Sequence, residues 1–161
     1  MTHPTTLIAD PQARAARADA KARPLLRFLR DECWTSTEIV ARLLGVQYAA
    51  AHRTLHQMQR DGLVQAEALA VVLPRDGAPG LQTSARHGSR RLVLWGITPH
   101  GLACAWDLDE VWQARPAFAR GRTSPTTVAH HLGVQRLRLA ADAAGWTGWT
   151  RRGRSSATRR A

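Results

Sequence analysis

The sequence predicts a mainly α-helical protein with a small β-ribbon, which is an α+β fold. Apolar side chains recur at helical spacing in several segments that carry capping and stop signals, and residues 68–73 and 91–98 are rich in strand-forming residues. The chain has 161 residues. That length suits one compact domain with appendages, whose core needs no disulfide or metal.

Residues 1–23 are predicted to be a basic N-terminal arm or helix. Residues 11–23 are strong helix formers without a large apolar side chain, and their basic residues are Arg14, Arg17, Lys21 and Arg23. Such a segment buries no face by itself, so it frays in solvent or orders on a partner. Pro24 suits the first turn of a new helix, the first core helix, with an apolar stripe of Leu25, Leu26, Phe28, Leu29 and Cys33.

Two further helices are predicted on either side of a tight turn. Residues 35–38, Thr-Ser-Thr-Glu, match the S/T-x-x-E capping box that begins a helix. Gly45 ends this helix because glycine tolerates positive φ. A third helix is expected from about Gln47 to Arg60, followed by Asp61-Gly62, with an inner face of Ala51, Leu55 and Met58.

A β-ribbon is expected next. Its strands are residues 68–73 and 91–98, and the loop between them, residues 74–90, carries two prolines and three glycines. Thr98-Pro99 is a cap followed by a first-turn proline, so another helix starts there. The acidic residues that follow are expected to mark a break and to stabilise the N-terminus of a second short helix: Asp107, Asp109 and Glu110.

The C-terminal part predicts one more helix and a tail. Ser124-Pro125 begins the helix and Gly145 ends it, with apolar positions at Val128, Leu132, Leu137 and Leu139. Residues 146–161 carry five arginines without an acid and are predicted to be disordered, with Trp146 and Trp149 holding the start of the tail to the domain.

One octapeptide pattern occurs twice. Residues 40–47, VARLLGVQ, recur at an offset of 88 as residues 128–135, VAHHLGVQ. A second helix-turn-helix is one explanation. The second copy runs into Arg136-Leu137-Arg138-Leu139 and stops at Gly145, with little room for another domain. A single long helix used for dimer contact is therefore the preferred interpretation.

The charge of the chain favours a polyanionic partner. Lys and Arg number 23 against 12 Asp and Glu, a formal net charge of +11, and nucleic acid is the commonest partner of such a field. Lys21 is the one lysine, so codon bias toward arginine is an alternative source of part of this pattern. Codon bias alone does not explain the excess of basic over acidic residues.

The order helix, capped helix, glycine turn, helix and ribbon is that of a winged helix-turn-helix. Residues 35–64, TSTEIVARLLGVQYAAAHRTLHQMQRDGLV, resemble winged-helix transcriptional regulators in the A-x-x-L-G-V turn and the L-x-x-M-x-x-D-G-L-V exit, and RLVLWGITPHGLACA resembles their wing strand and T-P-x-G helix start. The domains expected are 1–23, the N-terminal arm; 24–120, the winged helix; 121–145, the C-terminal helix; and 146–161, the basic tail.

The outer face of the third helix holds the candidate DNA-binding residues, because an α-helix fits the major groove. Gln pairs with adenine, Arg with guanine, and Tyr or His with phosphates or base edges. The candidates on this helix are Gln47, Tyr48, Ala49, His52, Arg53, His56, Gln57 and Arg60. An ordinary solvated helix face is the alternative. The basic loop adds candidates for the backbone or the minor groove: Arg75, Arg86, His87, Arg90 and Arg91.

The segment SPTTVAHHLGVQRLRLAADAAGW also resembles a stretch of the replication-relaxation family of plasmid and mobile-element proteins. In that family a winged helix precedes a His-containing helix, then tryptophans and an acidic, nuclease-like region. His130 or His131, Trp146 and Trp149 match, whereas residues 151–161 stand where the acidic region is expected. The resemblance implies a plasmid-linked DNA-binding protein, with relaxosome or replication proteins as partners.

No enzyme, cofactor or metal site is expected. The sequence lacks G-x-S-x-G, H-E-x-x-H, a Walker loop and zinc-ligand spacing, and adjacent His130 and His131 diverge on a helix. Cys33 and Cys104 are interpreted as small buried apolar groups. No membrane-spanning run or secretory signal is evident, so a cytoplasmic, nucleoid-associated protein is expected.

Double-stranded DNA is thus the expected partner, bound by a homodimer that acts as a transcriptional regulator or a plasmid replication or mobilisation accessory protein. The alternatives are a protein-interaction module that uses the winged helix as a scaffold and the basic tail as a charged contact, and a metal-dependent nuclease.

Overall fold

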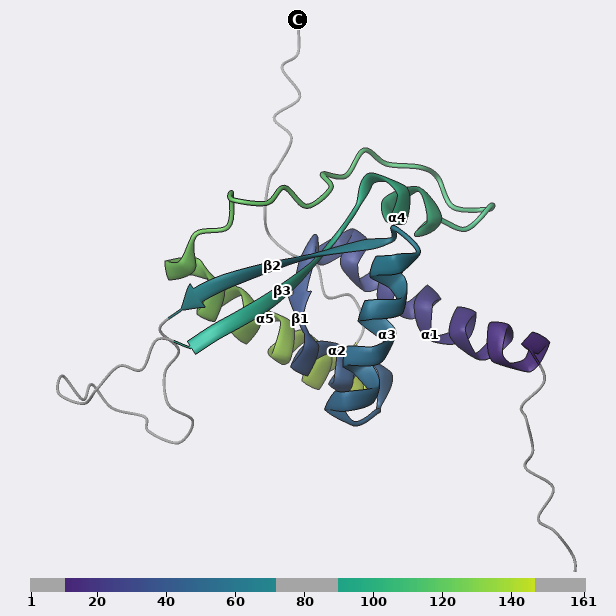
Figure 1. The fold of residues 1–161 in the computed structure, drawn as a ribbon, viewed down its shortest axis with the longest axis horizontal. Coiled ribbons are helices and arrows are strands. Elements are labelled where there is room, and N and C mark those ends of the chain that lie inside the picture. Colours follow the sequence, from purple (N-terminus) through teal and green to yellow (C-terminus); the bar gives the residue numbers. More distant parts are fainter. Residues whose placement is uncertain (1–10, 72–89, 147–161) are drawn as a thin grey trace, which may run out of the picture.

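The computed structural model describes residues 11–71 and 90–146. Helices predominate and a small antiparallel sheet crosses the molecule (Figure 1), which confirms the α+β class. The elements in chain order are α1 (Pro11–Glu32), β1 (Trp34–Ser36), α2 (Thr37–Leu44), α3 (Tyr48–Arg60), β2 (Val64–Val71), β3 (Arg90–Ile97), α4 (Pro99–Cys104) and α5 (Pro125–Ala143).

The sheet has three strands in the order β1-β3-β2. β2 and β3 pair antiparallel from Val64 opposite Ile97 to Val71 opposite Arg90, so the predicted ribbon is confirmed. Its first strand begins at Val64, four residues before the predicted start at residue 68. β1 is not among the predicted elements. It lies along the other edge of β3, with Thr35 opposite Trp95. Three residues are too few to show the alternation of apolar and polar side chains that marks a strand in sequence. The strand forms because the edge of β3 provides hydrogen-bonding partners for its backbone.

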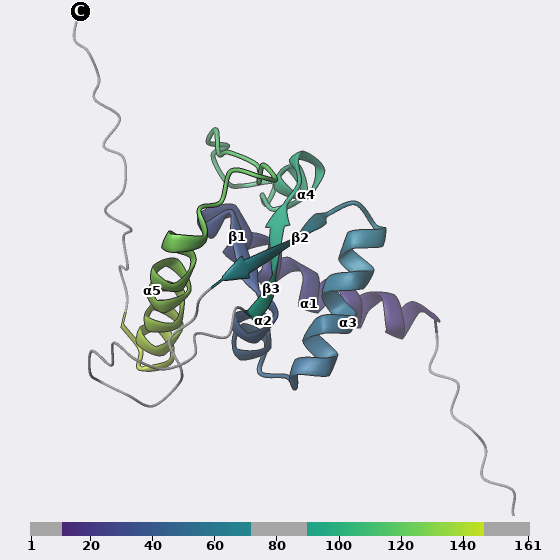
Figure 2. The ribbon, with the colours of Figure 1, turned by 60° about the vertical axis from the view of Figure 1, so that its left-hand side comes forward.

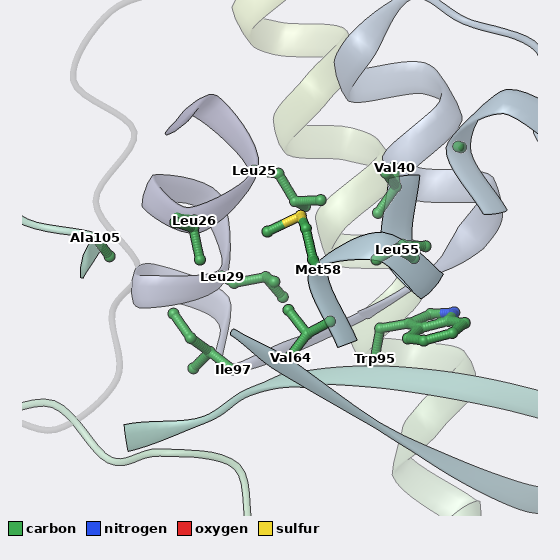
Figure 3. Close-up of a cluster of buried hydrophobic side chains, with 11 residues drawn as sticks. Leu25, Leu26, Leu29, Val40, Leu55, Met58, Val64, Trp95, Ile97 and Ala105 are labelled. Atoms are coloured by element: carbon green, nitrogen blue, oxygen red, sulfur yellow. The ribbon is translucent and has the colours of Figure 1, made fainter. Parts of the chain in front are cut away.

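Two apolar clusters flank the sheet because alternate residues of β3 point to opposite faces. Trp95 and Ile97 belong to the cluster in Figure 3, together with Leu25, Leu26, Leu29, Val40, Leu55, Met58 and Val64. Leu94 belongs to the second cluster, with Phe28, Trp34, Ile39, Phe118, Val128 and Leu132. The predicted inner face of α3 is therefore confirmed, and so is the apolar stripe of the first core helix apart from Cys33, which lies beyond α1. α3 is anchored through its inner face.

α1 runs without a break from Pro11 to Glu32 and contains Pro24. The expectation that a new helix begins at Pro24 is wrong, and the boundary expected between residues 23 and 24 falls inside this helix. A proline within a helix costs about 3 kcal/mol because a backbone hydrogen bond is lost. Pro24 is exposed, and the buried Leu25, Leu26 and Leu29 that follow it offset this cost through packing.

The cap of α2 is Ser36, not Thr35. The Ser36 hydroxyl accepts a hydrogen bond from the amide of Ile39 at 3.4 Å. Thr35 lies in β1 instead, where it is fully buried and donates its hydroxyl hydrogen to Gln135 of α5. Glu38 forms ion pairs with Arg42 and Arg136. The prediction that Thr35 begins a capping box is therefore wrong, because Thr35 is part of strand β1 and Ser36 is the cap.

The segment after α4 contains a second correction. Thr98 caps α4 as predicted, with Pro99 in the first turn. Residues 105–124 form turns and irregular structure, so the second short helix predicted there is wrong. Asp107 and Glu110 form ion pairs with Arg27 and Arg30 of α1, and these carboxylates thereby attach the segment to α1 instead of stabilising a helix N-terminus.

α5 is a single helix from Pro125 to Ala143, which confirms that the second copy of the octapeptide is not a helix-turn-helix. Its use for dimer contact stays a prediction. Its inner face includes Val128 and Leu132, as predicted. Leu137 is 59% exposed, so its predicted place on that face is wrong. Gln135, the repeat's counterpart of the exposed Gln47, is 1% exposed and donates to the carbonyl oxygen of Trp34 at 2.7 Å.

Arg138 attaches α5 to α1. It donates hydrogen bonds to Glu32 at 2.8 Å and to Asp31 at 3.2 Å, and its guanidinium lies 5.3 Å from the centre of the Phe28 ring. Burial disfavours the charge of Arg138, but these hydrogen bonds and the negative charges of Glu32 and Asp31 together outweigh burial and raise the pKa of the guanidinium above its ordinary value.

Cysteine and tryptophan positions differ in part from expectation. Cys104 is exposed and Cys33 is half-buried, so the prediction that both are buried is wrong. Trp34 and Trp95 are in the core. Trp146 is 71% exposed and is not held against the domain. Trp149 lies outside the described residues.

Candidate nucleic-acid interface

The turn between α2 and α3 positions the candidate interface. Gly45 adopts φ 61°, and its backbone N–H donates hydrogen bonds to the carbonyl oxygens of Ala41 and Arg42 at the end of α2. Gln47 is the N-cap of α3 in an extended conformation, and its side chain makes no capping hydrogen bond. The exposed Gln47 amide group is therefore not engaged in capping the helix that it precedes.

The outer face of α3 is open to solvent. Ala51, Leu55 and Met58 anchor the opposite face, and Tyr48 is 60% exposed. His52 is half-buried, whereas the remaining candidates on this helix are exposed: Gln47, Ala49, Arg53, His56, Gln57 and Arg60. In Figure 2, α3 and α5 lie on opposite sides of the molecule, with α2 between them. The described parts of the chain thus leave this face uncovered.

Some candidates on α3 contact one another. His52 and His56 approach with their Nε2 atoms 3.2 Å apart. Near the C-terminal end, Arg60 donates to Gln57 at 2.7 Å, and Gln57 donates to Asp61 at 3.0 Å. Gln57 and Arg60 therefore form an exposed network with Asp61, while Gln47, Tyr48, Ala49 and Arg53 stand outside it.

Trp95 is a residue of this region that the sequence does not reveal. Its ring lies 6.1 Å from that of His52 and 5.1 Å from that of His56, nearly perpendicular to both. Because Trp95 belongs to β3, its place beneath α3 depends on tertiary packing. A strand-forming pattern indicates only that it is buried.

The acidic side chains that form ion pairs lie on other elements. Glu32 is paired with Arg138, Glu38 with Arg136 and Asp107 with Arg27. The sequence of α3 contains no Asp or Glu, and the acidic residue nearest to it in sequence is Asp61 at its C-cap. The N-terminal end of α3, which carries the positive end of the helix dipole, therefore has no carboxylate in its first turn to offset it.

Of the five DNA-binding candidates predicted in the basic loop and its flanks, the structure describes two, Arg90 and Arg91. Arg91 is exposed in β3, opposite Ala70 of β2. Arg90 is the first residue of β3 and lies opposite Val71. Arg75, Arg86 and His87 lie outside the described residues. The sheet thus brings the start of β3 and the end of β2 together at the end of the ribbon.

The order α1-β1-α2-α3-β2-β3, with strands arranged β1-β3-β2, defines a winged helix, in which α2 and α3 form the helix-turn-helix and β2–β3 the wing. No family model and no curated protein matches the chain. Among solved structures it is similar to a mutant of ZitR from Lactococcus lactis in apo form, with 19% identity over 58% of each chain and a TM-score of 0.38. At this TM-score the likeness adds nothing to the assignment, which rests on the topology.

Within residues 11–71 and 90–146, no helix is both long and apolar enough to cross a membrane.

Proposed function

We propose that this chain binds double-stranded DNA in a sequence-specific manner, with α3 in the major groove and the β2–β3 wing against the backbone or minor groove. The observation that carries the proposal is the outer face of α3, which is largely exposed, has no Asp or Glu within the helix itself and is anchored by its buried opposite face. A helix presented in this way fits the dimensions of the major groove.

The residue types on this face suit base readout. Gln47 reaches adenine N6 and N7 in a bidentate contact, and Arg53 reaches guanine O6 and N7. Tyr48, Ala49 and His52 complete the N-terminal half of the face, which in helix-turn-helix proteins contacts base edges. His56, Gln57 and Arg60 lie further along and are assigned to phosphate or outer base contacts, as are the wing residues Arg90 and Arg91.

We assign the chain a role as a homodimeric transcriptional regulator or as an accessory protein in plasmid replication or mobilisation. The winged helix supports the first role, and the resemblance of residues 124–146 to replication-relaxation proteins supports the second. The homodimer is proposed through α5, on which Leu137 is an exposed apolar side chain.

Selection of bound duplexes from a random library, followed by sequencing, tests this function. An enriched palindrome whose half-site centres are about one helical turn apart, roughly 10 bp, is the result expected of a dimer. A library that yields no enriched sequence would overturn specific readout. Repeating the selection with the chain ended after Gly145 removes the basic tail, and loss of all binding in that chain would assign the affinity to the tail instead of α3.

A protein-interaction module is the second candidate, favoured by an apolar group in the segment after α4. Leu108 is fully exposed, and Val111 and Trp112 are 82% and 67% exposed. Exposed apolar residues that form a contiguous patch often mark protein contacts. Replacing all three by serine is expected to leave DNA binding intact if α3 is the functional surface, and to abolish partner capture if this segment is.

A further inference from the structure

His52 and His56 bring two imidazole nitrogens together on the outer face of α3. The two residues are one helical turn apart, so their side chains share a face. Their Nε2 atoms are 3.2 Å apart and their ring centres 4.4 Å apart. The two nitrogens are therefore within hydrogen-bonding distance of each other, and the tautomers of the rings decide which of them donates.

Trp95 packs against both imidazole rings on the side of the protein core. Its indole is 1% exposed and its Nε1 donates to the Thr37 hydroxyl at 3.0 Å, which fixes the ring. The two imidazoles meet this ring at interplanar angles of 84° and 87°. The Tyr48 ring stacks with that of His52, with the ring centres 6.3 Å apart and an angle of 13° between the planes. These contacts restrict the rotamers of His52 and His56, so little ordering is needed to bind a ligand between them.

The separation of the nitrogens, which is that of a hydrogen bond, also matches the separation of two ligands on one metal ion. With metal–nitrogen bonds of about 2.05 Å, two imidazoles subtending a tetrahedral angle lie roughly 3.3 Å apart, and two at a right angle about 2.9 Å. The observed 3.2 Å falls between these values. We propose that His52 and His56 form a two-histidine site for a divalent transition-metal ion on the outer face of α3.

The chemistry of the donors defines the class of ion. Imidazole suits zinc, nickel and copper, whereas magnesium and calcium require oxygen ligands. Among the described residues no group of three His, Cys, Asp or Glu side chains is placed to hold a metal. The site therefore offers two protein ligands, and water completes the coordination. Binding requires the Nε2 lone pair of each neutral ring, with the ring proton carried on Nδ1.

The chain contains an internal comparison. His130 and His131 are adjacent on α5, their ring centres are 6.0 Å apart, and His131 stacks on Trp34 at 5.4 Å. Neighbouring residues on a helix diverge by about 100°. This pair is therefore expected to bind divalent metals far more weakly than His52 and His56, although each pair has two imidazole groups.

Calorimetric titration of the full chain with nickel chloride and with zinc chloride tests the site. Each chain carries His3→Gln, so that this histidine outside the described residues contributes no nickel binding. The parent is expected to bind one ion at this site. His52→Gln and His56→Gln are each expected to weaken it by more than about tenfold, at least the loss typical for removing a partner of a metal ligand. His100→Gln and His130→Gln serve as controls and are expected to keep the parent affinity.

A second measurement covers the case in which a variant folds poorly. Nickel raises the thermal midpoint of a protein that binds it only when folded, so the parent and the His130→Gln control should melt higher in nickel and the double variant H52Q/H56Q should not. Equal affinity and equal melting shifts in the parent and the double variant would overturn the site. Because both measurements omit DNA, their outcome is independent of the proposed DNA binding.

Discussion

The side chain of Gln135 in α5 accepts a hydrogen bond from the hydroxyl of Thr35 in β1 at 2.9 Å, although the two residues are 100 positions apart in sequence. Both are almost completely buried, and Gln135 also donates to the carbonyl oxygen of Trp34. A buried amide with both ends engaged fixes the position of α5 against the sheet.

Gln135→Leu is expected to lower the free energy of unfolding by about 2 kcal/mol or more. The substitution keeps the approximate volume but removes both hydrogen bonds, and a buried polar group left without its partner costs about 1–3 kcal/mol. Urea denaturation followed by tryptophan fluorescence measures the change. Gln113→Leu, at an exposed position, is the matched control and should change stability by less than about 0.5 kcal/mol. Equal stability of both variants would contradict the role of Gln135.

Glu38 should make stability depend on pH. Its pKa is below the ordinary value of 4.5, chiefly because of the hydrogen bond from Arg136; burial opposes this, and the charges of Arg136 and Arg42 assist it. A lowered pKa in the folded state means that the stabilisation is present above the unfolded-state pKa and is lost as pH falls through the folded-state pKa. The Glu38 side chain is 41% exposed, so solvent screening limits its contribution to less than about 1 kcal/mol.

Glu38→Gln is therefore expected to be less stable than the parent at pH 7 and equally stable once the pH lies well below 4.5. Urea midpoints measured from pH 7 down to pH 2 follow the difference. Asp109→Asn, which alters an exposed carboxyl group outside these ion pairs, is the control. A difference between parent and Glu38→Gln that stays constant across this range would disprove the linkage.

Two glycines should respond in opposite directions to the same substitution. A Cβ at Gly133, within α5, meets nothing within 4 Å, so Gly133→Ala should stabilise the protein by about 0.5–1 kcal/mol through helix propensity. A Cβ at Gly101 would overlap the backbone oxygen of Leu63, so Gly101→Ala should lower the melting temperature. Thermal unfolding of the two variants checks the signs, and a stabilised Gly101→Ala would show that α4 is not packed against Leu63 as described.

Arg53→Ala is expected to weaken DNA binding by about 1–3 kcal/mol on the selected duplex, if Arg53 contacts a base or a well-placed phosphate. Fluorescence anisotropy with a labelled duplex measures the dissociation constant. Arg120, an exposed arginine in the segment between α4 and α5, provides a variant of equal charge change, Arg120→Ala. Loss of affinity to the same extent in both variants would point to net charge instead of the α3 face.

The affinity for DNA should fall steeply with salt. Neutralising ~6–10 phosphates gives a slope of log K against log salt of about −5 to −9. Anisotropy titrations at several concentrations of potassium chloride give this slope directly. A much shallower dependence would reject a mechanism in which phosphate contacts supply most of the affinity.

The sequence by itself determined the helix-turn-helix and the ends of several elements. Gly45 ends α2, Thr98-Pro99 begins α4, and Ala51, Leu55 and Met58 mark the inner face of α3. These signals act within a few residues, since a positive φ, a cap or a helical period needs no distant partner. The exposure of most α3 candidates follows from the same period.

Only the tertiary structure decided the rest. β1 exists because β3 pairs with it, Pro24 stays inside α1 because the leucines after it are packed, and Asp107 turns to Arg27 instead of a helix end. The packing of His52 and His56 against Trp95 likewise depends on a strand more than 35 residues away, whereas their approach to each other follows from helical spacing. Such features depend on partners remote in sequence, so no local pattern records them.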